Sequence, residues 1–244
     1  ISNDCLTKPE PLVIFGQHIN PDDEAGLISV NSGYVLASAD ELYWTVSGKG
    51  SHAAQPHLGT DAVLASANLI LTLHTHMNKY KNPLQPGVLS VTSIHGGTAT
   101  NIFPEEVKLM GTFRSFNEEW RQKMHKLLKE KSKQICAIYG ADCNLRIENG
   151  YPSLFNNPET TEFIRNTASD LIGKENLLVF EPKMWAEDFA YYAQKIPATF
   201  WFLGVKSKGQ NEMPPLHNSK LSPDESALSV GTAMFVKTAF DFFK

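Results

Sequence analysis

The sequence predicts an α/β protein in which a domain built on a parallel sheet is interrupted by a smaller domain of antiparallel strands. Leu12 to Phe15 is a continuous apolar run between Pro11 and Gly16, which is typical of a strand buried on both faces of a parallel sheet. From Leu42 onward apolar and polar residues alternate, which indicates a half-covered antiparallel strand in a different sheet. Beyond Tyr151 the chain returns to the α/β pattern.

The first strand is followed by two polar residues. Gln17 and His18 come after the apolar run, so we expect them just past the C-terminal end of the strand. In open α/β sheets ligands bind at that edge, because the strand ends and the following loops form a crevice.

The alternating strand leads into a turn region, Gly48 to Gly59, and then into a helix. Thr60 can cap this helix, because a hydroxyl at that position accepts a hydrogen bond from a free N–H of the first turn. Helical spacing predicts one inward face formed by Val63, Ala67, Ile70, Leu71 and His74.

Two strands, a helix and a further strand complete the inserted domain. The strands are expected at Val88 to Ile94, Val107 to Arg114 and Cys143 to Ile147. Asn117 caps the second helix and Gly140 ends it. Its inward residues are Trp120, Met124, Leu127 and Leu128. The order is the ferredoxin-like βαββαβ unit, with both helices on one face of a four-stranded sheet and with a sheet edge open to a second molecule.

The last part of the chain resumes the first domain. We expect a helix near Glu159 to Leu171 and an apolar strand from Ala198 to Val205. Ser222, with Pro223 and Glu225 after it, forms a capping box for the final helix. The predicted domains are therefore residues 1–41 and 151–244 for the parallel-sheet domain, and residues 42–150 for the insertion.

Composition excludes several classes of function. The 244 residues carry a net charge of -4 and a pI near 6.1, without a basic run, so neither nucleic acid nor an anionic membrane surface is an expected partner. No window of about 18 apolar residues and no signal peptide are visible, which favours the cytoplasm. Because the chain begins with Ile1 and soon reaches an apolar strand, we expect a chain that starts in the middle of its protein.

The three cysteines, Cys5, Cys136 and Cys143, match no zinc or redox spacing. We interpret them as reduced structural thiols, and one bridge stays open as an alternative.

Two of the eight histidines are candidates for chemistry. His18 ends the buried strand, and His217 stands in a loop before the last helix, so both could line one crevice. Neutral imidazole is a common ligand of zinc-like metals, but a hydrolytic zinc needs about three protein ligands, so two histidines alone do not complete a site.

Two further segments carry a functional interpretation beside a structural one. Glu187 and Asp188 either start a helix, where the helix dipole favours negative charge, or line a site. The segment from Gly48 to His57 is rich in small residues, which let a substrate or another backbone approach closely.

Motifs along the whole chain resemble those of metallopeptidase family 20, which includes aminoacylases, hippurate hydrolases and N-acyl-amino-acid deacetylases. The motifs are Phe15-Gly16-Gln17-His18, Gly48-Lys49-Gly50-Ser51-His52-Ala53-Ala54, Gly97 with Asn101-Ile102-Phe103-Pro104, Gly111-Thr112-Phe113-Arg114, Ala186-Glu187-Asp188-Phe189, Phe202-Leu203-Gly204 and Leu216-His217.

The resemblance implies a zinc-peptidase-like catalytic domain with an inserted dimerisation, or lid, domain. It implies that His18 and His217 each ligate one of two divalent metal ions, which are zinc, manganese or nickel. His52 would stabilise the oxyanion in the site of the opposite subunit of a homodimer. Asn101 and Arg114 would hold the free carboxylate of the substrate, for which the planar fork of arginine is suited. Glu187 would lie near the site.

The implied reaction is metal-dependent hydrolysis of the amide bond of N-acyl amino acids or small peptide-like substrates. Such enzymes also use a Cys-Gly-His-Asp type motif and a Glu-Glu pair, which supply further metal ligands and the general base, and neither motif occurs here. We therefore expect an incomplete metal site and an inactive chain when it stands alone. The alternatives are a non-catalytic dimerisation or small-molecule binding fragment and a true peptidase of the same family.

Overall fold

The computed structural model describes residues 6, 7 and 9–244, so Cys5 lies outside the described residues. The chain forms two compact units. Unit 1 comprises the described residues up to Leu36 together with Leu154–Lys183 and Glu187–Lys244, and unit 2 comprises Ala37–Ser153 together with Met184–Ala186.

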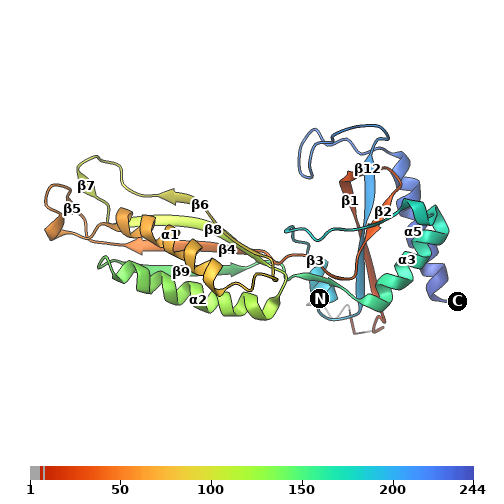
Figure 1. Ribbon diagram of the computed structural model, residues 1–244, viewed down its shortest axis with the longest axis horizontal. Coiled ribbons are helices and arrows are strands. Elements are labelled where there is room, and N and C mark those ends of the chain that lie inside the picture. Colours follow the sequence, from red (N-terminus) through yellow and green to blue (C-terminus); the bar gives the residue numbers. More distant parts are fainter. Residues whose placement is uncertain (1–5, 8) are drawn as a thin grey trace. The chain divides into compact units, whose positions relative to one another are not determined.

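Unit 1 is organised by a four-stranded sheet in the order β1-β12-β2-β11 (Figure 1). β1 (Ile14–Glu24) and β12 (Ala198–Lys206) pair in parallel, as predicted. β2 (Ile28–Val30) runs antiparallel to β12, and β11 (Leu177–Val179) runs parallel to β2, so the sheet is mixed rather than wholly parallel.

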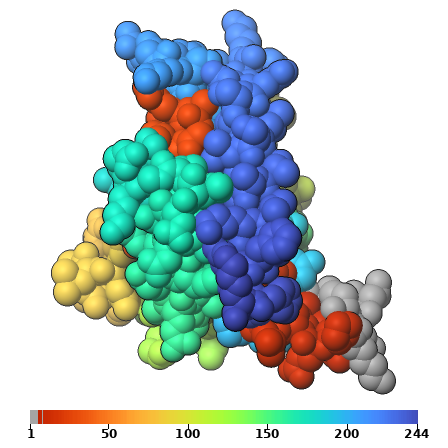
Figure 2. All heavy atoms as spheres, turned by 90° about the vertical axis from the view of Figure 1, so that its right-hand side faces the viewer, coloured from red at the N-terminus to blue at the C-terminus, as the bar shows by residue number. Residues whose placement is uncertain are grey.

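Helices α3 (Pro158–Ile172) and α5 (Ser226–Phe242) cover one face of this sheet and lie side by side in Figure 2. The core between them and the sheet is formed by Ile28, Val30, Ile164, Ala168, Trp201, Leu203, Val205, Ala227 and Met234. The smaller elements of the unit are β3 (Gly33–Leu36), β10 (Leu154–Asn156), the short helix η2 (Lys174–Asn176) and α4 (Ala190–Ala193).

Two predictions for β1 are wrong. β1 does not end before His18, because β12 continues to pair with it as far as the partners Asn20 and Gly204. β1 is also the edge strand of its sheet, so the apolar run is only partly covered and Leu12 is 75% exposed.

The final helix begins at Ser226 rather than at Pro223. The N–H of Asp224 is bonded to the carbonyl of Val205, which holds this residue against the end of β12. The carboxylate of Asp224, rather than the hydroxyl of Ser222, then accepts the N–H of Ser226 at 3.0 Å.

Unit 2 confirms the predicted order of strand, helix, strand, strand, helix and strand. Its sheet has the order β6-β8-β4-β9 with antiparallel pairs throughout. The strands are β4 (Asp40–Ser47), β6 (Gly87–His95), β8 (Glu106–Ser115) and β9 (Asp142–Asn149). Helices α1 (Ala62–Tyr80) and α2 (Glu118–Ala137) share one apolar core with the sheet (Figure 1). A short ladder of β5 (Ser51–His52) with β7 (Ile102–Phe103) and the short helix η1 (Pro56–Leu58) complete the unit.

The predicted cap of α1 is wrong, and so is most of its predicted inward face, because Ile70 packs against the core whereas Val63, Ala67, Leu71 and His74 are exposed. Asp61 caps the helix by accepting the N–H of Leu64 at 2.9 Å, whereas Thr60 is held by its N–H to the carbonyl of Lys49. The small side chains of Ala62 and Ala65 allow close packing on the sheet, and this leaves Val63 and Leu71 exposed. The buried face consists of Ala62, Ala65, Ser66, Leu69, Leu73 and Met77.

The predictions for the second half of unit 2 are confirmed. Asn117 caps α2 by accepting the N–H of Trp120 at 2.8 Å, and Gly140, with a φ of 71°, turns the chain after the helix. Cys136 and Cys143 are free buried thiols that contact each other, and the hydrogen bond with Cys136 raises the pKa of the Cys143 thiol. Both therefore have a structural role.

A buried ionic cluster joins the beginning of β4 to α2. Asp40 is fully buried and accepts hydrogen bonds from Arg121 at 2.5 and 2.8 Å and from His125 at 2.7 Å. Arg121 also donates to the carbonyl of Gly150, at the end of β9. Burial alone would raise the pKa of Asp40, but the hydrogen bonds from His125 and Arg121 hold it below its ordinary value.

We predict that Arg121→Met lowers the free energy of unfolding by about 3–5 kcal/mol at neutral pH, because Asp40 is left buried without its main partner. Since the folded-state pKa of Asp40 is lowered, its stabilising contribution is present above about pH 4 and is lost as the pH falls through that pKa. The difference between variant and wild type should therefore shrink in acid. Denaturant titrations at several pH values measure this. Lys123→Met, which removes an exposed pair on the same helix, is the control and should change little; an equal effect of both variants would contradict the prediction.

Candidate functional site

His18 is oriented by the backbone of its own strand. Its Nδ1 lies 2.8 Å from the carbonyl oxygen of Ile19, and a carbonyl can only accept, so Nδ1 carries the proton. In the neutral ring Nε2 then keeps a lone pair. Metal-bound histidines commonly have this arrangement, because the hydrogen bond fixes both the tautomer and the ring orientation.

Glu187 is a candidate site residue, because its pKa is raised and His18 is one of the groups that act on it. Burial raises the pKa of Glu187, and its hydrogen bond with Asp188 raises it further, while the nearby His18 acts in the opposite direction. Glu187 and Asp188 form the turn before α4, whose first N–H groups bond to their carbonyls. The segment is thus a helix start and also places a perturbed carboxyl group near His18.

His217 has an unusual backbone conformation. With a φ of 66° it is the one residue other than glycine with positive φ in the described part of the chain. It lies in a turn closed by the N–H of Asn218 and the carbonyl of Pro215 at 3.2 Å. Such strained residues are found preferentially at functional sites.

The donors in unit 1 fit a metal centre only in part. Imidazole and carboxylate are the groups that zinc-like metals take, and the tautomer of His18 suits this role. Within residues 6, 7 and 9–244, however, no group of three or more His, Cys, Asp or Glu side chains is placed to hold a metal ion. His18, His217 and Glu187 therefore do not form a closed site by themselves.

His52 has the opposite tautomer from His18. Its Nδ1 accepts the backbone N–H of Ala54 at 3.1 Å, so in the neutral ring the proton lies on Nε2. The residue is exposed on β5, and its Nε2–H remains as the donor of the ring. An imidazole held in this way can donate to a developing negative charge.

Asn101 lies next to His52, whereas Arg114 does not. The N–H of Ala53 bonds to the carbonyl of Asn101 at 2.9 Å, beside the β5–β7 ladder. Arg114 lies eight residues beyond Glu106 along β8, a span of about 27 Å, and donates to the carbonyl of Met184 at 3.0 Å. One copy of unit 2 therefore carries the two predicted carboxylate ligands at opposite ends of its sheet.

An open hollow of about 510 Å³ lies beside the His52 end of unit 2. Its wall is mainly the connection between β6 and β8, where Gly97 has a φ of 75°. The lining residues are Ala53, Asp61, Val63, Gly96, Gly97, Thr98, Ala99, Thr100, Ile102, Phe103 and Pro104. The sequence motifs include part of this loop, but the hollow itself has no signal in the sequence.

Comparisons with known proteins agree with the motifs. A model described as peptidase family M20/M25/M40 matches residues 3–241. Thermostable carboxypeptidase 1 of Saccharolobus solfataricus is 33% identical over 230 residues, which are 94% of this chain and 58% of that protein. N-acetyldiaminopimelate deacetylase of Bacillus subtilis is 33% identical over 243 residues, which are 98% of this chain and 62% of that protein.

A solved structure extends the likeness to three dimensions. The YXEP protein of Bacillus subtilis, described as a dinuclear metal-binding peptidase from the M20 family, superposes with a TM-score of 0.78 at 27% identity. The match covers 96% of this chain and 58% of that one. The chain thus spans less than two thirds of the length of the relatives it matches.

The described helices include none that is both long and apolar enough to cross a membrane.

We predict that the neutral side chains of His18 and His52 populate opposite tautomers, with the proton on Nδ1 in His18 and on Nε2 in His52. Ring nitrogen-15 shifts of the labelled protein, recorded in alkaline solution, distinguish the two forms. Ala54→Pro removes the N–H that holds His52 and should give this ring a mixed tautomer population, whereas Ala54→Gly keeps the N–H and should not. A proton on Nδ1 of wild-type His52 would contradict the assignment.

Proposed function

The chain belongs to peptidase family M20/M25/M40, and from this premise we propose that it is part of a metal-dependent amidohydrolase. The proposed reaction is hydrolysis of the amide bond of N-acyl amino acids or small peptide-like substrates. A relative named as a deacetylase supports this choice, because removal of an acetyl group from an amino acid is such a hydrolysis. A true peptidase is the second candidate, and a relative named as a carboxypeptidase favours it.

The observation that carries the proposal is the pair of opposite tautomers. His18 presents a lone pair on Nε2, as a metal ligand must, and His52 presents a proton on Nε2, as an oxyanion donor must. Two histidines that were only packed or solvated would not need backbone partners that orient them in these complementary ways.

We propose that His18 and His217 each ligate one of two divalent ions, which are zinc, manganese or nickel. Bound there, the metal would polarise the scissile carbonyl and activate a water molecule. Glu187 would line the site beside His18, where its raised pKa favours the protonated carboxyl more than at the surface. The remaining ligands and the general base would come from outside the 244 residues.

His52 would donate its Nε2–H to the oxyanion that forms during attack on the amide. Asn101 and Arg114 would hold the free carboxylate of the substrate. The separation of about 27 Å between the two ends of β8 prevents these two residues of one copy from meeting on one small molecule. They can meet on one substrate if His52 and Asn101 come from a second copy.

A homodimer through unit 2 would supply that second copy. β6 is an edge strand of the unit 2 sheet, and α1 exposes Leu64 and Leu71 by 52% and 69%. An open edge and an apolar helix surface are the features by which two copies pair about a two-fold axis. A cytoplasmic location stays a prediction from the sequence.

We predict that two inactive variants of the full-length enzyme restore activity when they are mixed. His52→Ala keeps its own metal ligands but cannot serve its partner, and His217→Ala loses a metal ligand but still offers His52. With free exchange about half of the dimers are hybrids with one working site each, so about a quarter of wild-type activity should return. Loss of an oxyanion donor typically reduces the rate about 100-fold or more, so the recovery would be clear above background.

The assay requires proof that subunits exchange, for which mass spectrometry of differently labelled variants is suitable. Glu162→Ala, at an exposed position of α3 in unit 1, is the control and should remain active without mixing. If exchange occurs and the mixture stays as inactive as its components, His52 does not act across the dimer.

A further inference from the structure

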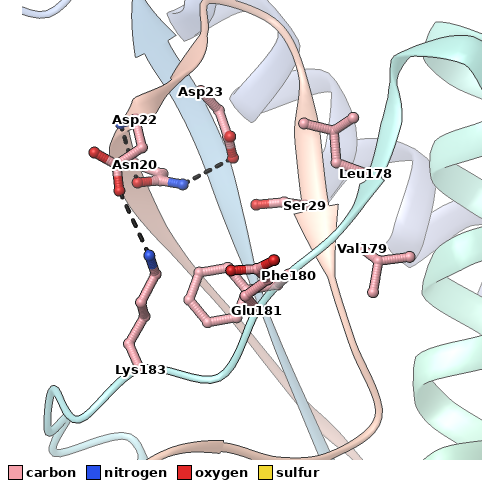
Figure 3. A pocket seen from close by; sticks show the side chains of 9 residues that line it. All are labelled: Asn20, Asp22, Asp23, Ser29, Leu178, Val179, Phe180, Glu181 and Lys183. Carbon is pink, nitrogen blue, oxygen red and sulfur yellow. Dashed lines mark hydrogen bonds and ion pairs between the residues drawn. The ribbon is translucent and has the colours of Figure 1, made fainter. Parts of the chain in front are cut away.

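A second cavity, of about 210 Å³, lies in unit 1 and contains polar groups that the proposed reaction does not use (Figure 3). Strands β1, β2 and β11 and the segment after β11 form its walls. The lining residues are Asn20, Asp22, Asp23, Ser29, Leu178, Val179, Phe180, Glu181 and Lys183.

The lining of this cavity is anionic. Asp22, Asp23 and Glu181 contribute three carboxylates, and Lys183 contributes one ammonium group. Lys183 approaches Asp22 only to 3.8 Å, and both side chains are partly exposed, so this pair neutralises little of the charge. Asp23 is oriented toward the buried Asn20, which donates to it from Nδ2 at 2.8 Å.

Ser29 gives the cavity a buried hydroxyl without a partner. The residue is 2% exposed, and its Oγ makes no hydrogen bond with any described residue. Figure 3 shows the side chain directed from β2 toward the space between Asp23 and Phe180. Buried hydroxyl groups in folded proteins are nearly always paired, so this one indicates a ligand with a hydrogen-bonding group.

The cavity lies on the same face of the sheet as His18. His18 is the register partner of Phe202 on β12, and Phe202 is the partner of Ser29 on β2, so their side chains point to one side. Two strand spacings separate His18 from Ser29, which is about 10 Å. Aromatic rings lie between His18 and the cavity. The ring centroid of Phe202 lies 6.4 Å from that of His18, and Phe202 stacks on Phe180, which lines the cavity, at 3.9 Å between centroids.

We propose that this cavity binds the terminal ammonium group of a substrate side chain and so selects N-acyl derivatives of basic amino acids. This inference rests on the proposed function, because it takes His18 to mark the scissile amide. Asp23, Glu181 and the hydroxyl of Ser29 offer three acceptors for the three donors of an ammonium ion. A volume of about 210 Å³ is several times the ~30 Å³ of one water molecule, which is enough for a methylene chain and its charged end.

A metal ion is a poorer fit for the same groups. The described residues hold no cluster of three carboxylate, imidazole or thiolate groups placed around one point. An ammonium ion can instead be held by two carboxylates and one neutral hydroxyl, which is the set that Asp23, Glu181 and Ser29 offer.

The test compares two substrates of equal length with the full-length enzyme. N-acetyl-lysine and N-acetyl-norleucine differ by the terminal ammonium, and we expect kcat/KM to be higher for the lysine derivative. Glu181→Gln should lower the ratio of the two kcat/KM values at least about tenfold, because a charge-assisted hydrogen bond is lost. Glu162→Gln, with the same change of charge on an exposed position of α3, should leave the ratio unchanged.

Binding of n-pentylamine, measured by calorimetry, gives a readout that does not depend on hydrolysis. Ser29→Ala should weaken binding without lowering the Tm, because in the free protein it only removes an unpaired buried hydroxyl. Lys183→Gln should tighten binding, because it removes the positive charge of the lining.

The outcomes separate the two proposals. Amine binding with these variant effects, but no hydrolysis of any N-acyl amino acid, would support the cavity and overturn the proposed function. Hydrolysis with equal kcat/KM for both substrates and no binding of n-pentylamine would overturn the cavity proposal and leave the proposed function standing. If Glu181→Gln lowers kcat/KM equally for both substrates, the cavity proposal is also overturned, since a merely structural role of Glu181 predicts that result.

Discussion

The buried contact of Asp40 with Arg121 and His125 is the constraint on which the architecture of unit 2 depends. A unit inserted into another domain must hold together the two points where the chain enters and leaves it. Asp40 stands at the first point, and Arg121 reaches from it to the carbonyl of Gly150 at the second. The N–H of Ala39 bonds across the same gap to Tyr151. β4 starts at this cluster and β9 ends at it, so these contacts hold the two crossing points of the chain together.

The register of that sheet decides what unit 2 can offer to a substrate. Arg114 lies near the buried cluster, and His52 lies beyond the opposite end of the strands. A rigid four-stranded sheet between them excludes a site made from both within one copy. The proposed sharing of sites between two copies is therefore a consequence of strand length. Sharing of sites between copies also explains why the backbone of Ala54 holds the exposed His52 in one tautomer. A donor that acts on a substrate in another subunit must be oriented in advance.

Periodicity made much of this fold predictable. The alternation in β4 and the capped helix after Asn117 each reflect one buried face, which local sequence encodes directly. The end of β1 was not predictable, because it depends on pairing with β12 about 180 residues away. In α1 the buried face uses small residues such as Ala65, while larger ones such as Leu71 stay exposed, so a ranking by hydrophobicity selects the wrong face. The candidate site residues followed from motifs, whereas the orphan hydroxyl of Ser29 and the tautomers required atomic positions.

The central claim is that one active site combines His18 of one subunit with His52 of the other. A crystal structure of the full-length enzyme with its metals and a phosphorus analogue of the tetrahedral intermediate tests this most directly. We predict a metal about 2.0–2.1 Å from Nε2 of His18, and Nε2 of His52 from the second subunit about 3 Å from an oxygen of the analogue. If His52 from the same subunit as His18 occupies that position, or if His18 binds no metal, the account is contradicted.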